Sequence, residues 1–279
     1  MSVRVRLFEE VCAFGFGDKT LSHKYLTEPK GHIYESESKI RVRKWTRLNF
    51  KAVLFDLHDT LAYLENPLNS EEASNFLLRH GYEVYPQSWN AASHYVGMVD
   101  YPKHGYSNRQ AFLEQILRRL DVEVNSDTLE KLAQLYDCRN RYSLFSDTTP
   151  AVRKAKRLGL KTAIVTTIPD FVFSSAITPI RDCFDIVMTG RRAACEKSNP
   201  SMHKQTLEEL ETIPEQAVMI GDELLVDIKI PKKLGMHTIL LDRSNEFKKK
   251  PHEADKKAKT LIEAMTIVEK WHKQEKKKG

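Results

Sequence analysis

The stretch AVLFDLHDTL, residues 52–61, decides the fold of this 279-residue chain. Its apolar run, residues 53–55, stops at Asp56 and continues as a polar turn. Four more short apolar runs follow, each with a helix-like stretch after it, at residues 163–165, 186–188, 218–220 and 239–241. Runs of this length are typical of buried parallel strands. Their alternation with helices predicts an α/β core, a doubly wound, Rossmann-like parallel sheet.

A polar residue ends each apolar run: Asp56, Thr166, Thr189, Asp222 and Asp242. An open α/β sheet places the carboxyl ends of its strands along one edge, and ligands bind there. We therefore expect acids and threonines to converge at this edge.

About a hundred residues separate the first two runs, far more than one crossover needs. Residues 66–146 show helical periodicity and no strand-like alternation. We expect Ser70 and Ser126 to be the N-caps of two helices, and two further helices to start at Pro86 and at Asn108. We expect a core of residues 51–64 and 147–271, with residues 65–146 as an inserted all-helical subdomain. That subdomain would lie over the carboxyl edge as a lid.

The two ends of the chain differ from its centre in charge. Residues 1–50 carry a net charge of +4 and residues 243–279 carry +6, whereas residues 51–242 carry −4. This distribution fits an enzyme domain with solvated ends better than a specific nucleic-acid-binding surface. Residues 1–50 form an N-terminal extension without an assigned role, residues 261–271 carry a helical stripe, and residues 272–279 form a basic tail.

Location and redox state also follow from the composition. The chain has no run of about 18 apolar residues, as a membrane span requires, and its first thirty residues lack the features of a secretory signal. Its four cysteines are scattered, without zinc-finger spacing, and are expected to be reduced thiols. We expect a cytoplasmic protein; the oligomeric state is not readable.

Two acidic motifs stand above this background. The first is FDLHDTL, residues 55–61, and the second is GDELLVD, residues 221–227, which contains Asp222 and Asp227. Mg²⁺ prefers oxygen ligands, so carboxylates from two neighbouring strands would suit it. Either Asp56 or Asp222 taken alone could simply cap a helix.

Together with Thr166 and Lys197, these motifs resemble those of the haloacid dehalogenase superfamily, whose members are mostly phosphatases. The family's first motif, Asp-x-Asp-x-Thr, is matched by residues 56–60, and its second, a strand-ending Ser or Thr, by Thr166. Its third, a lysine often followed by proline, is matched by Lys197. Its fourth, Gly-Asp with a second Asp nearby, is matched by Asp222 and Asp227. The helical insertion resembles the family's cap domain.

The resemblance implies a Mg²⁺-dependent phosphatase. Asp56 would attack phosphorus and form an aspartyl phosphate. Mg²⁺ would be held by Asp56, Asp222 and the backbone carbonyl of His58, with Asp227 holding Lys197 or a water on the metal. Thr166 or Thr167 would donate a hydrogen bond to the phosphate, and Lys197 would supply positive charge to it.

The chain departs from the family at His58, where the phosphatases carry the aspartate that acts as general acid and base. Histidine can perform both steps, because its unperturbed pKa near 6.5 permits either protonation state. Asp59 stands where the family usually has glycine. It could keep His58 protonated, take over the acid role or face solvent.

Two alternatives stay open from the sequence. A metal-independent haloacid-dehalogenase-type hydrolase would not need Asp at position 58, but it would have no use for the pair Asp222 and Asp227. A catalytically impaired relative would bind a phosphorylated ligand or partner. The expected substrate is a small phosphorylated metabolite, and the side chains that could select it are Tyr63, His94, Tyr95, Lys103, His104, Arg109 and Arg141.

Overall fold

The structure, a computed structural model, describes residues 50–247 and 251–276. Its main feature is a six-stranded sheet in which every pairing is parallel. The strands lie in the order β5 (Ile186–Thr189), β4 (Lys161–Thr166), β1 (Ala52–Phe55), β6 (Ala217–Gly221), β7 (His237–Leu241) and β8 (Lys256–Ala258). The predicted α/β class is confirmed. The predicted N-terminal extension, apart from Phe50, and residues 277–279 of the predicted basic tail lie outside the described residues, whereas residues 272–276 of that tail continue a helix that begins at Leu261.

The chain builds this sheet outward from β1 in both directions. It adds β4 and β5 on one side of β1 and then β6, β7 and β8 on the other. The strand order therefore reverses at β1, and the crevice at such a switch point is where open α/β sheets bind ligands. Asp56 leaves β1 and Asp222 leaves β6, its immediate neighbour. The sequence missed β8, a three-residue strand with a lysine-rich sequence and no apolar run.

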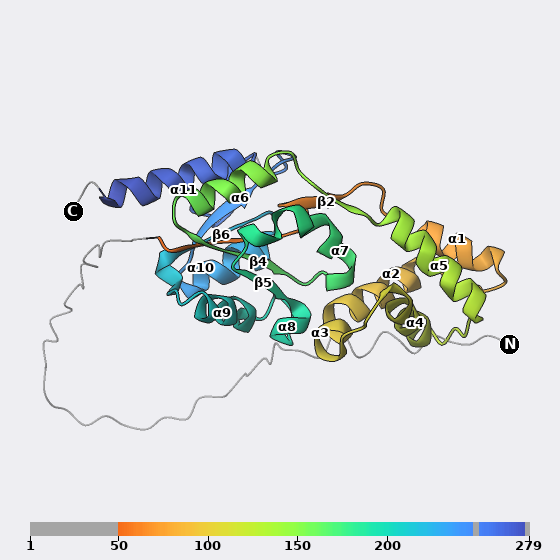
Figure 1. Cartoon of the computed structure of the whole chain (residues 1–279). Coiled ribbons are helices and arrows are strands. Elements are labelled where there is room, and N and C mark those ends of the chain that lie inside the picture. The colour runs from red at the N-terminus through yellow and green to blue at the C-terminus, as the bar shows by residue number, and fades with distance from the viewer. Residues whose placement is uncertain (1–49, 248–250, 277–279) are drawn as a thin grey trace, which may run out of the picture. The chain divides into compact units, whose positions relative to one another are not determined.

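Helices cover both faces of the sheet (Figure 1). One face packs against α6 (Thr148–Arg157), α7 (Asp170–Ile177) and α11 (Leu261–Lys276), burying alternate strand residues such as Val53 and Phe55. The other face packs against α8 (Gly190–Ala193) and α9 (Pro200–Glu209), burying Ala52 and Leu54. β1 therefore presents apolar side chains to both faces of the sheet, as expected for a strand that is buried on two sides. The remaining short elements are η2 (Thr178–Cys183), η3 (Pro214–Gln216), η4 (Leu224–Lys229) and α10 (Ile230–Leu234).

The helical insertion, residues 65–141, has its own apolar core and extends to the right of the sheet in Figure 1. It comprises α1 (Ser70–Arg79), α2 (Pro86–Tyr95), η1 (Val96–Asp100), α3 (Tyr101–His104), α4 (Arg109–Arg119) and α5 (Ser126–Arg139). The expected starts at Pro86 and Asn108 are confirmed. Two expected N-caps are wrong by one residue, because the asparagine before each helix accepts the first-turn amide: Asn69 caps α1, and Asn125 caps α5.

Two short strands connect the insertion to the core. β2 (Ala62–Leu64) and β3 (Tyr142–Leu144) pair antiparallel, so the expectation of no strand within residues 66–146 is wrong at its end. Three residues are too few to show a period-2 pattern, and the pairing is made with a segment 78 positions away for Leu64 and Tyr142. The outgoing and returning chains therefore meet in a small sheet beside the first motif.

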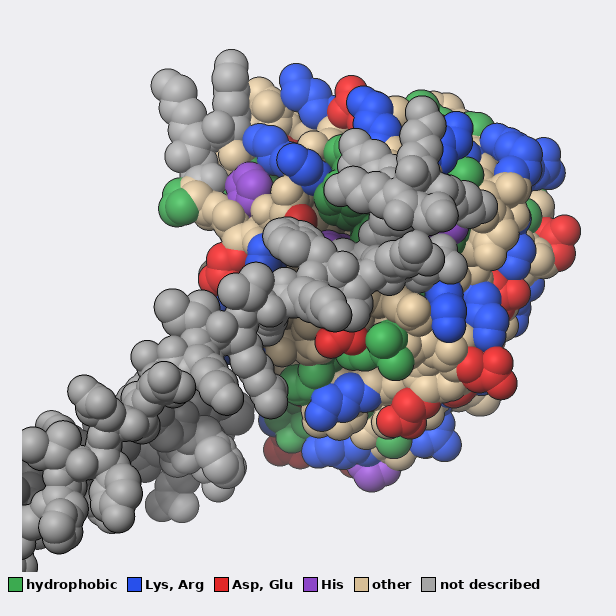
Figure 2. Space-filling view, turned by 90° about the vertical axis from the view of Figure 1, so that its left-hand side faces the viewer, with side chains coloured by type: hydrophobic (Ala, Val, Ile, Leu, Met, Phe, Trp, Pro, Cys, Tyr) green, Lys and Arg blue, Asp and Glu red, His purple; other side chains and the backbone are tan. Residues whose placement is uncertain are grey.

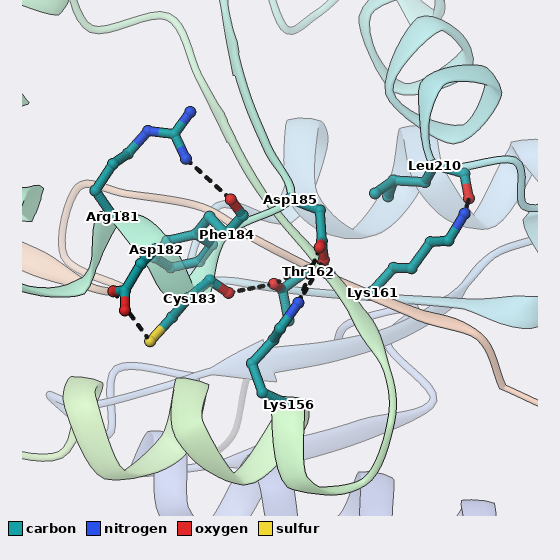
Figure 3. A network of polar contacts seen from close by, with 9 residues as sticks. All are labelled: Lys156, Lys161, Thr162, Arg181, Asp182, Cys183, Phe184, Asp185 and Leu210. Atoms are coloured by element: carbon teal, nitrogen blue, oxygen red, sulfur yellow. Dashed lines mark hydrogen bonds and ion pairs between the residues drawn. The ribbon is translucent and has the colours of Figure 1, made fainter.

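A polar network fixes the amino ends of β4 and β5, at the edge opposite the carboxyl ends (Figure 3). The carboxylate of Asp185 accepts from the backbone nitrogen of Thr162 at 2.7 Å and from Nζ of Lys156 at 2.9 Å. The Thr162 hydroxyl donates to the carbonyl of Cys183 at 2.5 Å. These contacts stabilise the loop before β5. The candidate active site lies at the opposite edge of the sheet, where the carboxyl ends of the strands meet.

The surface in Figure 2 carries lysine and arginine side chains with acidic ones between them. The visible part of this face is therefore of mixed charge and is not one continuous basic field. Within the described ranges no helix has the length and apolar character that crossing a membrane requires. The three cysteines there, Cys138, Cys183 and Cys195, are free thiols.

Candidate active site

Three carboxylates gather where β1 and β6 end. Asp56 continues the pairing of these strands, because its backbone nitrogen donates to the carbonyl of Ile220 at 2.9 Å. Oxygens of Asp56, Asp222 and Asp227 all lie within 4.8 Å of one another. Asp56 is 8% exposed and Asp227 is fully buried. The sheet edge thus concentrates negative charge in a region with little water.

Lys197 lies between two of these acids. It comes from the loop between α8 and α9 and is 5% exposed. Its Nζ forms an ion pair with Asp56 Oδ1, and a second ion pair with Asp227 Oδ1 at 2.7 Å. Burial alone would lower the pKa of Lys197, but Asp227 and Asp56 raise that pKa above its usual value. The two carboxylates therefore favour the charged form of Lys197, which links the end of β1 to the helical turn of residues 224–229 after β6.

The segment after β6 places the other two acids. A side chain at Gly221 would lie 2.3 Å from the carboxyl of Asp227, so glycine is required for this approach. The second Asp227 oxygen accepts from the backbone nitrogen of Glu223 at 3.0 Å. Asp222 accepts a hydrogen bond from the Thr60 hydroxyl at 3.0 Å, and this contact joins residues 221–227 to residues 55–61.

The charges of this cluster do not balance. Three carboxylates share one ammonium group, and the pKa of each acid is raised, chiefly by burial. Repulsion from Asp56 and Asp227 adds to the burial of Asp222 and brings its pKa to about 8. That of Asp227 rises to about 6, since Lys197 partly offsets burial. An oxygen-only donor set with surplus negative charge fits a hard divalent cation such as Mg²⁺.

The turn after Asp56 presents His58 beside the cluster. Its backbone is closed by a hydrogen bond from the amide of Asp59 to the carbonyl of Ala62 at 2.8 Å, and Asp59 adopts φ +53°. A left-handed backbone explains why glycine suits this position and why aspartate is among the few residues that tolerate it. The His58 side chain is 43% exposed, with Nε2 at 3.6 Å from Asp59 Oδ2 and Nδ1 at 3.1 Å from the hydroxyl of Tyr142.

The two threonine candidates lie on the next strand. Thr166 ends β4, which pairs with β1, and is buried. Its hydroxyl accepts from the backbone nitrogen of Ile168 at 3.2 Å. Thr167 follows it and is half-buried. Their expected role toward phosphate stays a prediction.

The seven substrate-contact candidates separate into different environments. Arg109 is buried, with Nε at 3.1 Å from Asp137 and its guanidinium over the ring of Phe171. The ring of Tyr63 lies against that of Phe145, tilted by 40° from it. The other five lie on the exposed surface of the insertion: His94, Tyr95, Lys103, His104 and Arg141. Only Arg109 therefore combines burial with charge.

Three residues to which the sequence assigned no role make contacts at the site. Thr60, within the first motif, holds Asp222. Tyr142 contacts His58. Arg243 donates to the carbonyl of Thr60 at 2.8 Å and binds Asp147 at 3.0 Å. Thr60 was visible in the motif, whereas Tyr142 and Arg243 come from distant segments that carry no pattern of their own.

His203 on α9 is fully buried behind Lys197, and neither ring nitrogen has a hydrogen-bond partner among the described residues. Burial, with the charge of Lys197, lowers its pKa to about 3. This value is below the unfolded value of about 6.5, so the unfolded chain binds the proton first. The histidine's contribution to stability is full above about pH 6.5 and is lost as the pH falls toward 3.

We therefore expect His203→Met to reduce the loss of unfolding free energy between pH 7 and pH 5 by about 1–2 kcal/mol. Urea unfolding at the two pH values measures this difference. His94→Met, at an exposed position, should show the wild-type pH dependence. An unchanged pH dependence in His203→Met would mean that His203 is not held neutral in the fold.

The fold and the site together define a three-layer α/β protein with a buried, lysine-linked carboxylate cluster at its switch point. A family model described as haloacid dehalogenase-like hydrolase matches residues 50–235. The chain therefore belongs to the haloacid dehalogenase-like hydrolases, and the resemblance predicted from the motifs is confirmed.

Individual relatives are more distant. The chain is 26% identical over 212 residues to human haloacid dehalogenase-like hydrolase domain-containing protein 3, covering 70% of this chain and 83% of that one. It is 28% identical over 197 residues to glyceraldehyde 3-phosphate phosphatase of Pyrococcus furiosus, covering 68% and 79%. The crystal structure of a phosphatase of the superfamily from Thermococcus onnurineus matches with a TM-score of 0.52 and 24% identity, over 78% and 98% of the two chains, and supports the fold.

Proposed function

We propose that this hydrolase is a Mg²⁺-dependent phosphatase that acts on a small phosphorylated metabolite through an aspartyl phosphate on Asp56. The observation that carries the proposal is the buried Asp56 carboxylate, paired with Lys197 and adjacent to Asp222 and Asp227. Burial raises the pKa of Asp56, and the ammonium group of Lys197 opposes this effect by favouring the ionised carboxylate. The surplus acids support a metal requirement, which a metal-independent dehalogenase would not have.

The reaction would proceed in two displacements. Asp56 attacks phosphorus, the bond from phosphorus to the leaving oxygen breaks, and His58 gives that oxygen a proton. His58 then takes a proton from a water molecule, which attacks the aspartyl phosphate and releases inorganic phosphate and free Asp56. Thr166 or Thr167 would donate to the phosphoryl oxygens, and Lys197 would hold Asp56 in place and offset their charge.

Mg²⁺ would be held by Asp56, Asp222 and the carbonyl of His58, and when bound it offsets the repulsion between the carboxylates and the phosphoryl group. Asp227 would act through Lys197, which it already contacts. This division assigns each acid of the cluster a separate task.

The nature of the substrate is supported by two observations. A relative carries the name glyceraldehyde 3-phosphate phosphatase, and the compound in that name is a small phosphate ester. A cavity of about 580 Å³ lies between the insertion and the core, lined by Met98, Val99 and Pro102 on one side and by Glu196 and Ser198, the neighbours of Lys197, on the other. We propose that the insertion acts as a cap and that this cavity receives the organic part of the ester.

The test is phosphate release from an aryl phosphate and from alkyl phosphomonoesters, with Mg²⁺ or with EDTA. We expect release only with Mg²⁺. An aryl leaving group needs little acid catalysis, so His58→Ala should release the aryl alcohol of the first turnover at close to the wild-type rate, and should lose about 10²-fold or more on the first turnover of alkyl esters. The matched control is His80→Ala, because His80 is an exposed histidine at the C-cap of α1.

Absence of release from every ester in the wild type would contradict the phosphatase. A haloacid assay without metal would then test the dehalogenase reading, and ligand binding without turnover would indicate the impaired relative. An equal loss on both ester classes in His58→Ala would contradict the acid role while leaving the phosphatase in place.

A further inference from the structure

We propose that Tyr142 is a positioning residue for the reaction: its hydroxyl holds the His58 imidazole at Nδ1 and leaves Nε2 to exchange the proton. This inference rests on the proposed function and deepens it. The contact joins residues 84 positions apart, and neither motif contains the tyrosine.

The first argument is that His58 needs an external restraint. It lies on a tight turn, and 43% of its side chain is exposed, so little packing fixes its rotamer. Asp59 does not provide the restraint, because its carboxylate lies 3.6 Å from Nε2 and is itself 56% exposed. A proton donor misplaced by about 1 Å can lose about 10²-fold in rate, so an unrestrained ring would act poorly.

The second argument is that Tyr142 can supply this restraint. It begins β3, where its backbone is fixed by pairing with Leu64 of β2, and it is only 9% exposed. Its hydroxyl lies 3.1 Å from Nδ1, and its ring meets the imidazole edge to face, with centroids 5.6 Å apart. The hydrogen bond and the ring contact together determine both the position and the tilt of the imidazole.

The third argument concerns which nitrogen carries the exchanged proton. When His58 is protonated, both nitrogens bear hydrogen, and Nδ1–H donates to the tyrosine oxygen. After Nε2 gives its proton to the leaving oxygen, Nδ1 keeps its hydrogen and the same bond persists. Nε2 then has a free electron pair with which to take a proton from water. One unchanged contact thus serves both displacements.

The placement of Tyr142 also links the acid to the helical insertion. β3 is the segment by which the chain returns from α5 to the core, and β2 is the segment by which it leaves. The His58 contact is therefore made by the connection between the two parts of the protein. The imidazole is oriented when this connection is in the arrangement seen in the structure.

The test is Tyr142→Phe, which keeps the ring contact and removes only the hydroxyl. We expect kcat on alkyl phosphates to fall about tenfold, as for the loss of one hydrogen bond of about 1.4 kcal/mol, with KM little changed. First-turnover release of the aryl alcohol should stay within about twofold. In a His58→Ala background the substitution should have no further effect, because the group that it positions is absent.

The control is Tyr82→Phe, which removes a hydroxyl that accepts from the backbone nitrogen of Asn125 at 3.1 Å within the insertion. It should leave both ester classes unchanged. Equal losses on aryl and alkyl esters, or the same loss with and without His58, would overturn the inference and make Tyr142 a packing residue. If His58→Ala itself shows no preference for aryl esters, the acid assignment fails first; if it does and Tyr142→Phe behaves as wild type, only this inference fails.

Discussion

Replacing Asp56 with asparagine should reduce phosphate release by at least about 10⁴-fold on aryl and alkyl esters alike. The amide has nearly the same shape as the carboxylate but is a far weaker nucleophile. It also gives Lys197 a neutral partner in place of an anion. Because no leaving group can substitute for the missing attack, the aryl ester should not rescue this variant as it should rescue the first turnover of His58→Ala. Steady-state assays with both esters measure the loss.

Asp242→Asn is the matched control for this experiment. Asp242 follows β7 in the same sheet, is 2% exposed, and pairs with Lys257 at 3.1 Å. It resembles Asp56 in burial and pairing but lies two strands away from β1. Its variant should keep turnover within about threefold of wild type. Turnover of Asp56→Asn near the wild-type rate would exclude Asp56 as the nucleophile.

Replacing Lys197 with methionine should have the second largest effect, on both stability and rate. The variant leaves three clustered acids with no ammonium between them, and breaking a buried charge network from one side costs about 3–5 kcal/mol. Loss of the group that orients Asp56 should also lower turnover by about 10³-fold. Lys257→Met, at a half-buried pair with one acid, should cost less than about 2 kcal/mol.

The stability loss in Lys197→Met should depend on pH. The folded pKa of Asp227, about 6 even beside the lysine, already exceeds the unfolded value of about 3.9. An acid whose pKa is raised by folding contributes its full stabilisation below its unfolded pKa. This contribution is lost as the pH rises through the folded pKa. Metal-free urea unfolding should therefore show the largest deficit near pH 8 and a smaller one near pH 5. A deficit independent of pH would contradict the charge explanation.

Much of the fold could be predicted from the chain because its strands are locally coded. Residues 53–55 and 218–220 are apolar on both faces, and each run stops at a polar residue, so the sheet and its reactive edge follow from pattern alone. Two elements could not be predicted in this way. Lys256–Ala258 has no apolar run and becomes a strand only because β7 offers an unpaired edge. Tyr142–Leu144 is too short to show a period and is defined by its partner β2.

The candidate site likewise contains residues that could be predicted from the sequence and residues that could not. Asp56, Asp222 and Asp227 follow strand ends and carry recognisable spacing, so their convergence could be expected. Lys197 could be assigned only through the resemblance, since a lone lysine in a loop has no local signal. Tyr142 approaches His58 through β2–β3 pairing, which no local pattern encodes. Residues that act through distant contacts are therefore the ones for which the structure was needed.

The most direct test of the central claim is to trap the phosphoryl group on the enzyme. His58→Ala, given an aryl phosphate and Mg²⁺, should still form the aspartyl phosphate but should hydrolyse it slowly, because the base for water attack is missing. Acid quenching followed by peptide mass spectrometry should then find the phosphoryl group on Asp56, and Asp56→Asn should carry none. Phosphate release without any phosphorylated Asp56, or with the label on another residue, would contradict the account.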